Sequence, residues 1–143
     1  MTNSKKPTTK KPTTKVYVYS IGRRKAAIAA VKLFKGKGET IINTLPVDKY
    51  FPAASEKIIY NKPFVVTSTV DKFYFEAKTS GGGKGGQLEA VTLAIARSLK
   101  KLDEKFGPIL RQSGLLTVDS RVRQRRMVGK GGKSRRGKQS PRR

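Results

Sequence analysis

Residues 87–105, QLEAVTLAIARSLKKLDEK, carry the clearest fold signal in this chain of 143 residues. Apolar side chains recur there at intervals of three and four residues, which is the spacing of one face of an α-helix. This apolar stripe consists of Leu88, Val91, Ile95, Leu99 and Leu102. The pattern predicts an amphipathic helix over 87–105 that buries its stripe in a core.

The sequence around this helix predicts shorter helical elements. Gly107-Pro108 is expected to end the helix, with one or two further turns over 109–113. Two short helices are expected upstream, over 48–51 and 55–60, and Pro63 is expected to act as a break after the second.

Four segments have the β-branched and aromatic composition of strands. They are residues 16–19, 31–34, 40–43 and 65–77. The run Gly22-Arg23-Arg24-Lys25 is expected to interrupt the first strand, and the first three segments are expected to form a meander. Within the fourth, Phe73 and Phe75 are expected on one face and Tyr74 on the other.

The sequence is strongly basic. It contains 33 Lys and Arg against 9 Asp and Glu, a formal net charge of +24 at pH 7. Self-repulsion at such a charge opposes compaction, whereas binding to a polyanion releases counterions and gains free energy. An anionic membrane would require a long amphipathic helix with large apolar anchors, and Trp is absent. The composition therefore favours a nucleic acid over a membrane as the partner.

Two residue types that are common in catalytic and metal sites are missing. The chain has no Cys and no His, which excludes disulfides, thiolate ligands and the usual general base at neutral pH. The acidic residues show no pairing typical of a catalytic site. These observations disfavour an enzyme, and they indicate no metal and no cofactor.

Positive charge is concentrated at both ends of the chain. Residues 1–15 hold five Lys, residues 121–143 hold eleven Lys and Arg, and neither segment contains an acid. Both lack an apolar periodicity, so we expect both to be disordered in the free protein. Residues 16–120 contain all 9 acids and a net charge of +8. We therefore expect one globular domain, over 16–120, between a basic arm and a basic tail.

The run Gly81-Gly82-Gly83-Lys84-Gly85-Gly86 lies between an expected strand and the expected helix. It matches the dinucleotide-binding fingerprint G-x-G-x-x-G, but the acid that should follow at the end of a second strand is missing. Its small residues would instead let phosphates approach the backbone N–H groups of a helix N-terminus. A flexible loop without a ligand is the alternative. A nucleotide-dependent enzyme that uses this loop is a further hypothesis.

Two groups of cations are candidate RNA contacts. Gly22-Arg23-Arg24-Lys25 is either a solvated charge run or, if strands hold it, a cluster that binds phosphate. The tail interleaves Arg and Lys with Gly and Ser, and Arg can both bridge phosphates and stack on bases.

In their order along the chain, the motifs resemble small-subunit ribosomal protein nine in its bacterial or organellar form. The likeness covers residues 16–143, and the ordered set is specific although no single motif is. The motifs that carry it are Tyr19-x-x-Gly22-Arg23-Arg24-Lys25-x-Ala27, Ile42-Asn43, Tyr50-Phe51, Pro63, Gly81-Gly82-Gly83-x-Gly85-x-Gln87, Ala94-Ile95-Ala96-Arg97-x-Leu99, Gly114-Leu115-Leu116-Thr117-x-Asp119-x-Arg121, and a basic tail that ends in Arg.

The resemblance implies an α+β fold like the second domain of ribosomal protein five, with helices on one face of a four-stranded sheet. It also implies a structural, non-enzymatic role on the ribosome, in the cytoplasm of a bacterium or in an organelle. The implied partners are the 3′-domain rRNA of the small-subunit head, neighbouring head proteins and peptidyl-site tRNA. A general basic nucleic-acid binder, histone-like or architectural, is the alternative.

Two sets of contacts are expected, the first implied by the resemblance alone and the second by the resemblance together with the charge pattern. Arg142 and Arg143 are expected to meet the backbone of the anticodon loop of the peptidyl-site tRNA. The expected rRNA-binding residues are Arg23, Arg24, Lys25, Gly82, Gly83, Lys84, Gly85, Gln87, Arg121, Arg123, Arg125, Arg126, Lys130, Lys133, Arg135, Arg136 and Lys138.

Overall fold

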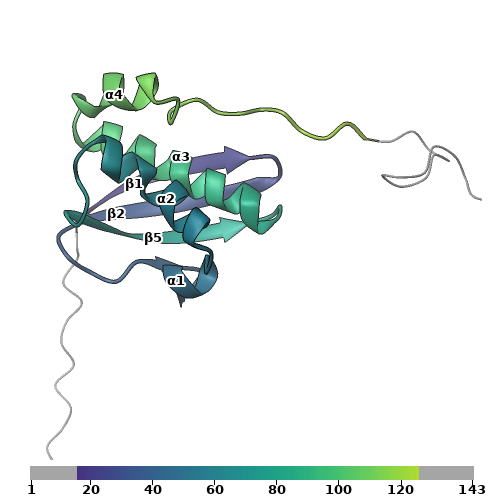
Figure 1. The fold of residues 1–143 in the computed structure, drawn as a ribbon, viewed down its shortest axis with the longest axis horizontal. Coiled ribbons are helices and arrows are strands. Elements are labelled where there is room, and N and C mark those ends of the chain that lie inside the picture. The colour runs from purple at the N-terminus through teal and green to yellow at the C-terminus, as the bar shows by residue number, and fades with distance from the viewer. Residues whose placement is uncertain (1–15, 126–143) are drawn as a thin grey trace, which may run out of the picture.

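Residues 16–125 are the part of the chain that the computed structural model describes. They form a mixed sheet that helices cover on one face (Figure 1). The strands, in the order in which they lie side by side, are β1 (Tyr17–Arg24), β2 (Ala27–Lys35), β5 (Phe73–Ser80), β3 (Ile41–Ile42) and β4 (Leu45–Pro46). The helices are α1 (Val47–Tyr50), α2 (Ala54–Val66), α3 (Lys84–Leu102) and α4 (Phe106–Gln112).

Helix α3 lies along the sheet and packs mainly on β1 and β2, with α2 beside it and α4 against both helices (Figure 1). The expected α+β architecture is therefore confirmed. The sheet has five strands instead of the expected four, because the short β4 pairs with β3. None of the helices in the described part of the chain combines the length and hydrophobicity needed to cross a membrane.

The two layers approach each other closely at Gly22 in β1. A Cβ atom on this residue would lie 1.9 Å from the carbonyl oxygen of Ala90 and 2.8 Å from the backbone nitrogen of Ala94. Two residues earlier, the buried hydroxyl of Ser20 donates a hydrogen bond to the carbonyl oxygen of Ala94 and lies 2.6 Å from the hydroxyl of Ser98. Small residues at these positions let the backbone of α3 rest directly on β1.

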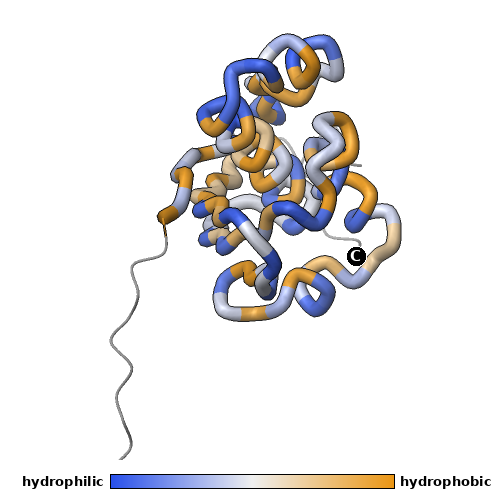
Figure 2. The backbone as a smooth tube through the Cα atoms, turned by 90° about the vertical axis from the view of Figure 1, so that its left-hand side faces the viewer, coloured by the Kyte–Doolittle hydropathy of each residue, from blue (hydrophilic) through white to orange (hydrophobic). Residues whose placement is uncertain are grey.

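The predicted apolar stripe forms the centre of the core. Of its five members, Leu88, Val91, Ile95 and Leu99 are buried and Leu102 is half-buried. Apolar and polar residues are interleaved along the chain (Figure 2), and the apolar residues that meet the stripe come from alternate positions of the strands. The sheet residues of the core are Ala27, Ala29, Val31, Leu33, Ile42, Phe75 and Ala77.

Two predictions about the strands are wrong. The run Gly22-Arg23-Arg24 does not interrupt the first strand but lies inside β1, and the chain turns only at Lys25 and Ala26. The first three strands do not form a meander either. β2 pairs with β5, and β3 joins the far side of β5 in parallel. A local pattern cannot report these pairings, because the partners lie far apart in the sequence.

Two boundaries also differ from the prediction. Residues 65 and 66 belong to α2, and the strand that was expected over 65–77 begins only at Phe73. Pro63 does not end the helix but is buried inside it. The carbonyl group that loses its helical donor belongs to Ile59. The expected opposite facing of Phe75 and Tyr74 is confirmed.

The last two helices also shift relative to the expectation. α3 begins at Lys84, three residues earlier than expected, and ends at Leu102. Gly107-Pro108 does not terminate it but lies in the first turn of α4, where a proline is tolerated because that N–H group has no helical partner. The segment 109–113 is largely helical, as predicted.

Replacing Gly22 with Ala is expected to destabilise the domain, because the new methyl group meets the backbone of α3, which cannot move aside as a side chain could. Overpacking of this kind costs about 1–3 kcal/mol or more of unfolding free energy. The matched control is Gly85→Ala, since a Cβ on Gly85 meets nothing within 4 Å. That change lies in a helix and should be neutral or stabilising by up to ~1 kcal/mol. Urea unfolding of both variants is the measurement, and equal stabilities would contradict the packing argument.

Candidate nucleic-acid interface

One end of the domain brings the β1–β2 turn against the glycine run that precedes α3. Gly81 and Gly82 have positive φ angles of 69° and 60°. A Cβ on Gly81 would lie 2.4 Å from the carbonyl oxygen of Ala26, and one on Gly82 would lie 3.0 Å from Ala27. These two glycines are therefore required by backbone conformation and by packing on the turn. Their contact places Lys25 beside the start of α3.

Gly83 and Gly85 face open space, whereas a Cβ on Gly86 would lie 3.4 Å from the carbonyl oxygen of Arg24. A Cβ on Gly83 or Gly85 would meet nothing within 4 Å, and both residues are exposed. Gly83 is the N-cap of α3 and offers no side chain to the first N–H groups of the helix. Those donors, the positive end of the helix dipole and the exposed Lys84 all favour a phosphate group at this position.

Gln87 holds the glycine run in place from within the protein. Its side-chain amide donates to the carbonyl oxygen of Gly81 at 3.0 Å, and its amide oxygen accepts from the hydroxyl of Tyr50 at 2.6 Å. The side chain thus has one donor and one acceptor engaged in shaping the loop. Direct contact between Gln87 and RNA stays a prediction.

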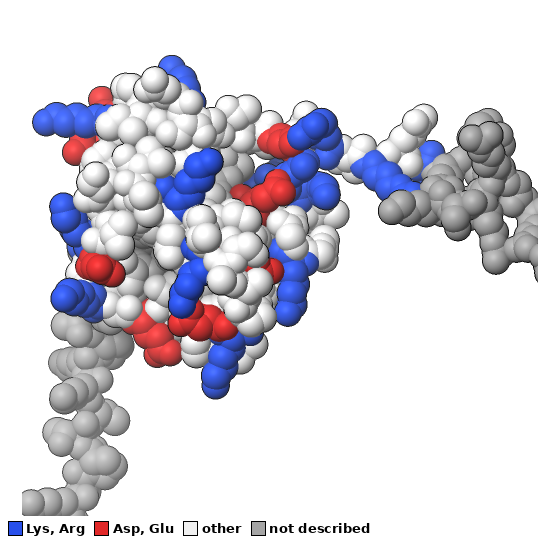
Figure 3. Space-filling model, in the orientation of Figure 1, with Lys and Arg blue, Asp and Glu red and all other residues white. Residues whose placement is uncertain are grey.

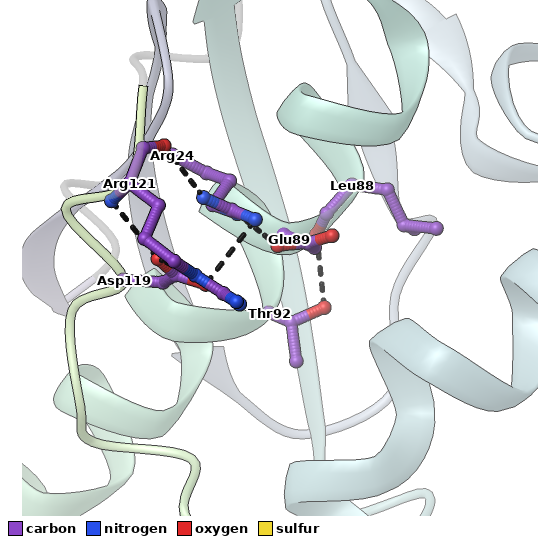
Figure 4. A network of polar contacts seen from close by, with 6 residues as sticks. All are labelled: Arg24, Leu88, Glu89, Thr92, Asp119 and Arg121. Atoms are coloured by element: carbon purple, nitrogen blue, oxygen red, sulfur yellow. Dashed lines mark hydrogen bonds and ion pairs between the residues drawn. The ribbon is translucent and has the colours of Figure 1, made fainter. Parts of the chain in front are cut away.

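Arg24 connects three parts of the chain (Figure 4). Its guanidinium forms an ion pair with Glu89 on α3, donates from Nη1 to the carbonyl oxygen of Arg121 at 3.1 Å, and lies 3.2 Å from Asp119. Arg121 in turn binds both carboxylate oxygens of Asp119, the shorter contact being 2.6 Å. The Arg24 side chain is only 12% exposed, so its charge is used mainly inside the protein.

This cluster fixes the base of the C-terminal tail. Hydrogen bonds from the side chain and the backbone N–H of Arg121, together with the charge of Arg24, hold the pKa of Asp119 well below its usual range. Asp119 therefore stays charged, and the attraction persists through the pH range in which a free aspartate titrates. The tail leaves the domain from this end (Figure 1), where acidic and basic side chains gather on the surface (Figure 3).

The structure brings the candidate residues of the β1–β2 turn and of the glycine run to the same end of the domain as the first cations of the tail. Arg23, Lys25 and Lys84 are exposed there, and so are Gly82, Gly83 and Gly85. Arg121, Arg123 and Arg125 follow on the exposed tail base, although Arg121 is also paired with Asp119. Eight of the named residues lie outside the described part of the chain: Arg126, Lys130, Lys133, Arg135, Arg136, Lys138, Arg142 and Arg143.

Three residues that matter at this site were not among the predicted ones. Glu89, Asp119 and Tyr50 position the cations or the loop, and none of them is basic. Asp119 lies two residues before Arg121, which is a local signal for their pairing. Glu89 lies 65 positions from Arg24, so only the folded chain shows that contact. In residues 16–125, no group of three or more acidic side chains is placed to hold a metal ion.

A known protein family matches this chain. The family model described as ribosomal protein S9/S16 aligns with residues 22–143. The chain belongs to the ribosomal protein S9/S16 family. The match starts at Gly22 and includes the glycine run, the Asp119 cluster and the basic tail, so it covers the interface described above.

Membership of the S9/S16 family makes the chain a small-subunit ribosomal protein that binds RNA and acts in translation. Proteins of this family are typically structural and not enzymatic. The family also implies rRNA and other ribosomal proteins as partners, and the ribosome as the location.

Replacing Arg24 with Gln is expected to release the tail base, because Glu89 and Asp119 would then lose the cation between them. Hydrogen bonds to charged groups are worth about 1.5–3 kcal/mol, and less where partners are exposed. We therefore expect a loss of about 1–2 kcal/mol of unfolding free energy, a raised pKa of Asp119, and faster amide exchange at 119–121. The control Lys25→Gln removes the neighbouring, exposed charge and should stay within about 0.5 kcal/mol. An Arg24 variant that behaves like the control would refute the anchoring role.

Proposed function

We propose that this chain is a structural constituent of the small-subunit head that binds the 3′ domain of its rRNA. The observation that carries the proposal is the convergence of three basic segments at one end of the domain. The exposed cations of the β1–β2 turn, the open N-terminus of α3 and the base of the basic tail all lie there. Such a cluster can bind several phosphates of a folded RNA at once.

Each part of this interface has a separate role in the proposal. Arg23 and Lys25 bind phosphates as side chains, while Gly83 and Gly85 admit a phosphate to the backbone N–H groups of α3. The glycine run is held in place by Gly82, which packs on the turn, and by the hydrogen bond from Gln87. The tail base is held by Arg24. The interface selects RNA shape by the relative positions of its phosphates, because contacts to phosphate carry no base information.

The tail is long enough to reach beyond this surface. From Arg121 to the C-terminus it has 22 further residues, and a fully extended chain of that length spans up to ~75 Å. Along it we propose rRNA contacts by Arg121, Arg123, Arg125 and the basic residues that follow. We propose that Arg142 and Arg143 contact the anticodon loop of the peptidyl-site tRNA, in the ribosome of a bacterium or an organelle. No catalysis is part of this function.

A tagged copy of the chain is expected to co-sediment with small subunits isolated from cells, and to stay bound at about 1 M salt. Charges more than ~3 Å apart are screened there, so a general basic binder should dissociate, whereas a protein built into folded rRNA should not. Large subunits and duplex DNA from the same lysate are the controls. Release at high salt, or equal recovery with DNA, would support the architectural alternative instead.

Deleting Arg142 and Arg143 is expected to leave assembly of the small subunit intact and to weaken tRNA in the peptidyl site. A charge-assisted contact to phosphate is worth ~1.5–3 kcal/mol at most, and less where water and salt reach it. Replacing both residues with Lys should restore part of the affinity, because the charge returns but the planar fork does not. The measurement is tRNA affinity on purified subunits at two salt concentrations. If the deletion leaves it unchanged at both, the tail serves rRNA only.

A further inference from the structure

β1 is an edge strand, and two cations of α3 lie on its free edge. Lys101 donates from Nζ to the carbonyl oxygen of Tyr19 at 2.9 Å, and Arg97 donates from Nη1 to that of Ile21 at 2.7 Å. These bonds occupy acceptors with which a strand of another molecule could pair. One role of the two cations is therefore to protect the edge.

Although Arg97 and Lys101 are hydrogen-bonded to the edge, no acidic side chain in the described part of the chain compensates their charges. In residues 16–125 the ion pairs involve Arg24, Lys57 and Arg121, and neither Arg97 nor Lys101 takes part in one. Both also keep spare donors after their bond to the strand, since an ammonium carries three N–H groups and a guanidinium five. Two unpaired positive groups are thus held at defined positions along β1.

Exposed aromatic rings lie next to this edge, on the sheet face that the helices leave open. Tyr17 and Tyr19 are 46% and 45% exposed, and Ile21, which follows on the same face, is 38% exposed. Lys32 is paired with Tyr19 across the strands, and Lys78 lies in the row of Ile21. The open face therefore combines ring surfaces with positive charge.

Two grooves meet at Tyr19. One follows the edge between β1 and α3 and has a volume of about 560 Å³, and the other crosses the open face and has a volume of about 800 Å³. Five cations and two acids line them. These charged residues are Arg97, Lys100, Lys101 and Glu104 in the edge groove, and Lys32, Glu76 and Lys78 in the groove of the open face.

We propose that this surface, which we call the β1 strip (Tyr17, Tyr19, Arg97 and Lys101), binds single-stranded RNA. Successive phosphates lie in the edge groove and accept hydrogen bonds from Arg97 and Lys101. A base that leaves the edge groove stacks on Tyr19, and its neighbour enters the groove of the open face. The inference rests on the proposed function, because it takes rRNA as the partner, and it adds a surface distinct from the turn, the glycine run and the tail.

Three observations favour unpaired RNA as the occupant. The carbonyl groups that hold Lys101 and Arg97 are two residues apart in a strand, about 6.6 Å, which is close to the separation of successive phosphates. The exposed ring of Tyr19 offers a stacking surface that only an unstacked base can use, whereas the Tyr17 ring already has the Lys32 ammonium over it, 5.0 Å from its centroid. Cations exceed acids in both grooves.

The first test is ultraviolet crosslinking of small subunits that carry the full chain, followed by mass spectrometry of the peptides. We expect nucleotide adducts at Tyr17 or Tyr19, in addition to adducts from the tail. A chain that is absent from small subunits would contradict the proposed function itself. The chain could instead be present and crosslink to RNA elsewhere, while the β1 strip carries no nucleotide adduct or is crosslinked to another protein. That result would overturn only the proposal about the strip.

The second test compares variants of the full chain for affinity to a single-stranded oligouridylate of about 12 nucleotides. Tyr19→Ala should weaken binding roughly fivefold to 150-fold, the range for loss of one stacked base, and Tyr19→Phe should retain it because the ring remains. Equal affinities of these two variants would overturn the stacking role.

The phosphate contacts are tested with the pair Arg97→Gln and Lys101→Gln. Gln keeps an N–H donor on a shorter side chain, and the change removes two charges. The log–log salt slope should fall by about 1.4, given ~0.7 for each phosphate contact to a single strand. The control pair Lys49→Gln and Lys62→Gln removes the same charge from exposed positions on α1 and α2. An equal fall in both pairs would overturn the proposal, and melting temperatures show whether the edge pair still folds. If it does not, the two Tyr19 variants decide the test.

Discussion

The contact between the backbone of α3 and β1 at Gly22 is the constraint on which the rest of this structure depends. With only 1.9 Å between a hypothetical Cβ and the carbonyl oxygen of Ala90, no other residue fits there without moving the helix. The close approach lets the hydroxyls of Ser20 and Ser98 meet in the interior, where each needs a partner. It also sets how far the long side chains of α3 extend past the edge of the sheet. The contact thereby brings Arg97 and Lys101 to the carbonyl groups of β1.

The same contact explains how a chain of such high charge forms a stable domain. Burial uses small residues and a narrow apolar stripe, so most charged side chains remain at the rim of the two layers or, as with Lys32 and Lys78, on the open face of the sheet. At the base of the tail, where Arg24 and Arg121 come close to each other, acidic side chains lie beside them. Glu89 and Asp119 flank Arg24, and the tail base docks through that cluster instead of being repelled by the β1–β2 turn. Attraction at one point thus offsets the repulsion between two basic segments and gives the tail a defined point of departure.

The glycine run combines a role in folding with the binding role that we propose for it. Gly81 and Gly82 are needed for a left-handed backbone and for contact with Ala26 and Ala27, which is a structural role. Gly83 and Gly85 have free space around them, so their missing side chains leave the start of α3 accessible. From the sequence these residues are equivalent, and their separate roles follow only from what lies next to each. The same holds for Arg23 and Arg24, which alternate between the open face and the face toward α3.

The sequence by itself determined the features that depend on local pattern and composition. The period of the apolar stripe identified α3, the alternation at 73–75 identified the faces of β5, and the charge balance indicated a nucleic acid as partner. Tertiary structure alone decided that β1 runs through Gly22, that β2 pairs with β5, and that α2 continues through Pro63. It also decided which cations are paired, because the carboxylates near Arg24 are 65 and 95 positions away in the sequence. Periodicity reports which face of an element is buried, but the partner that buries it is chosen by packing between distant segments.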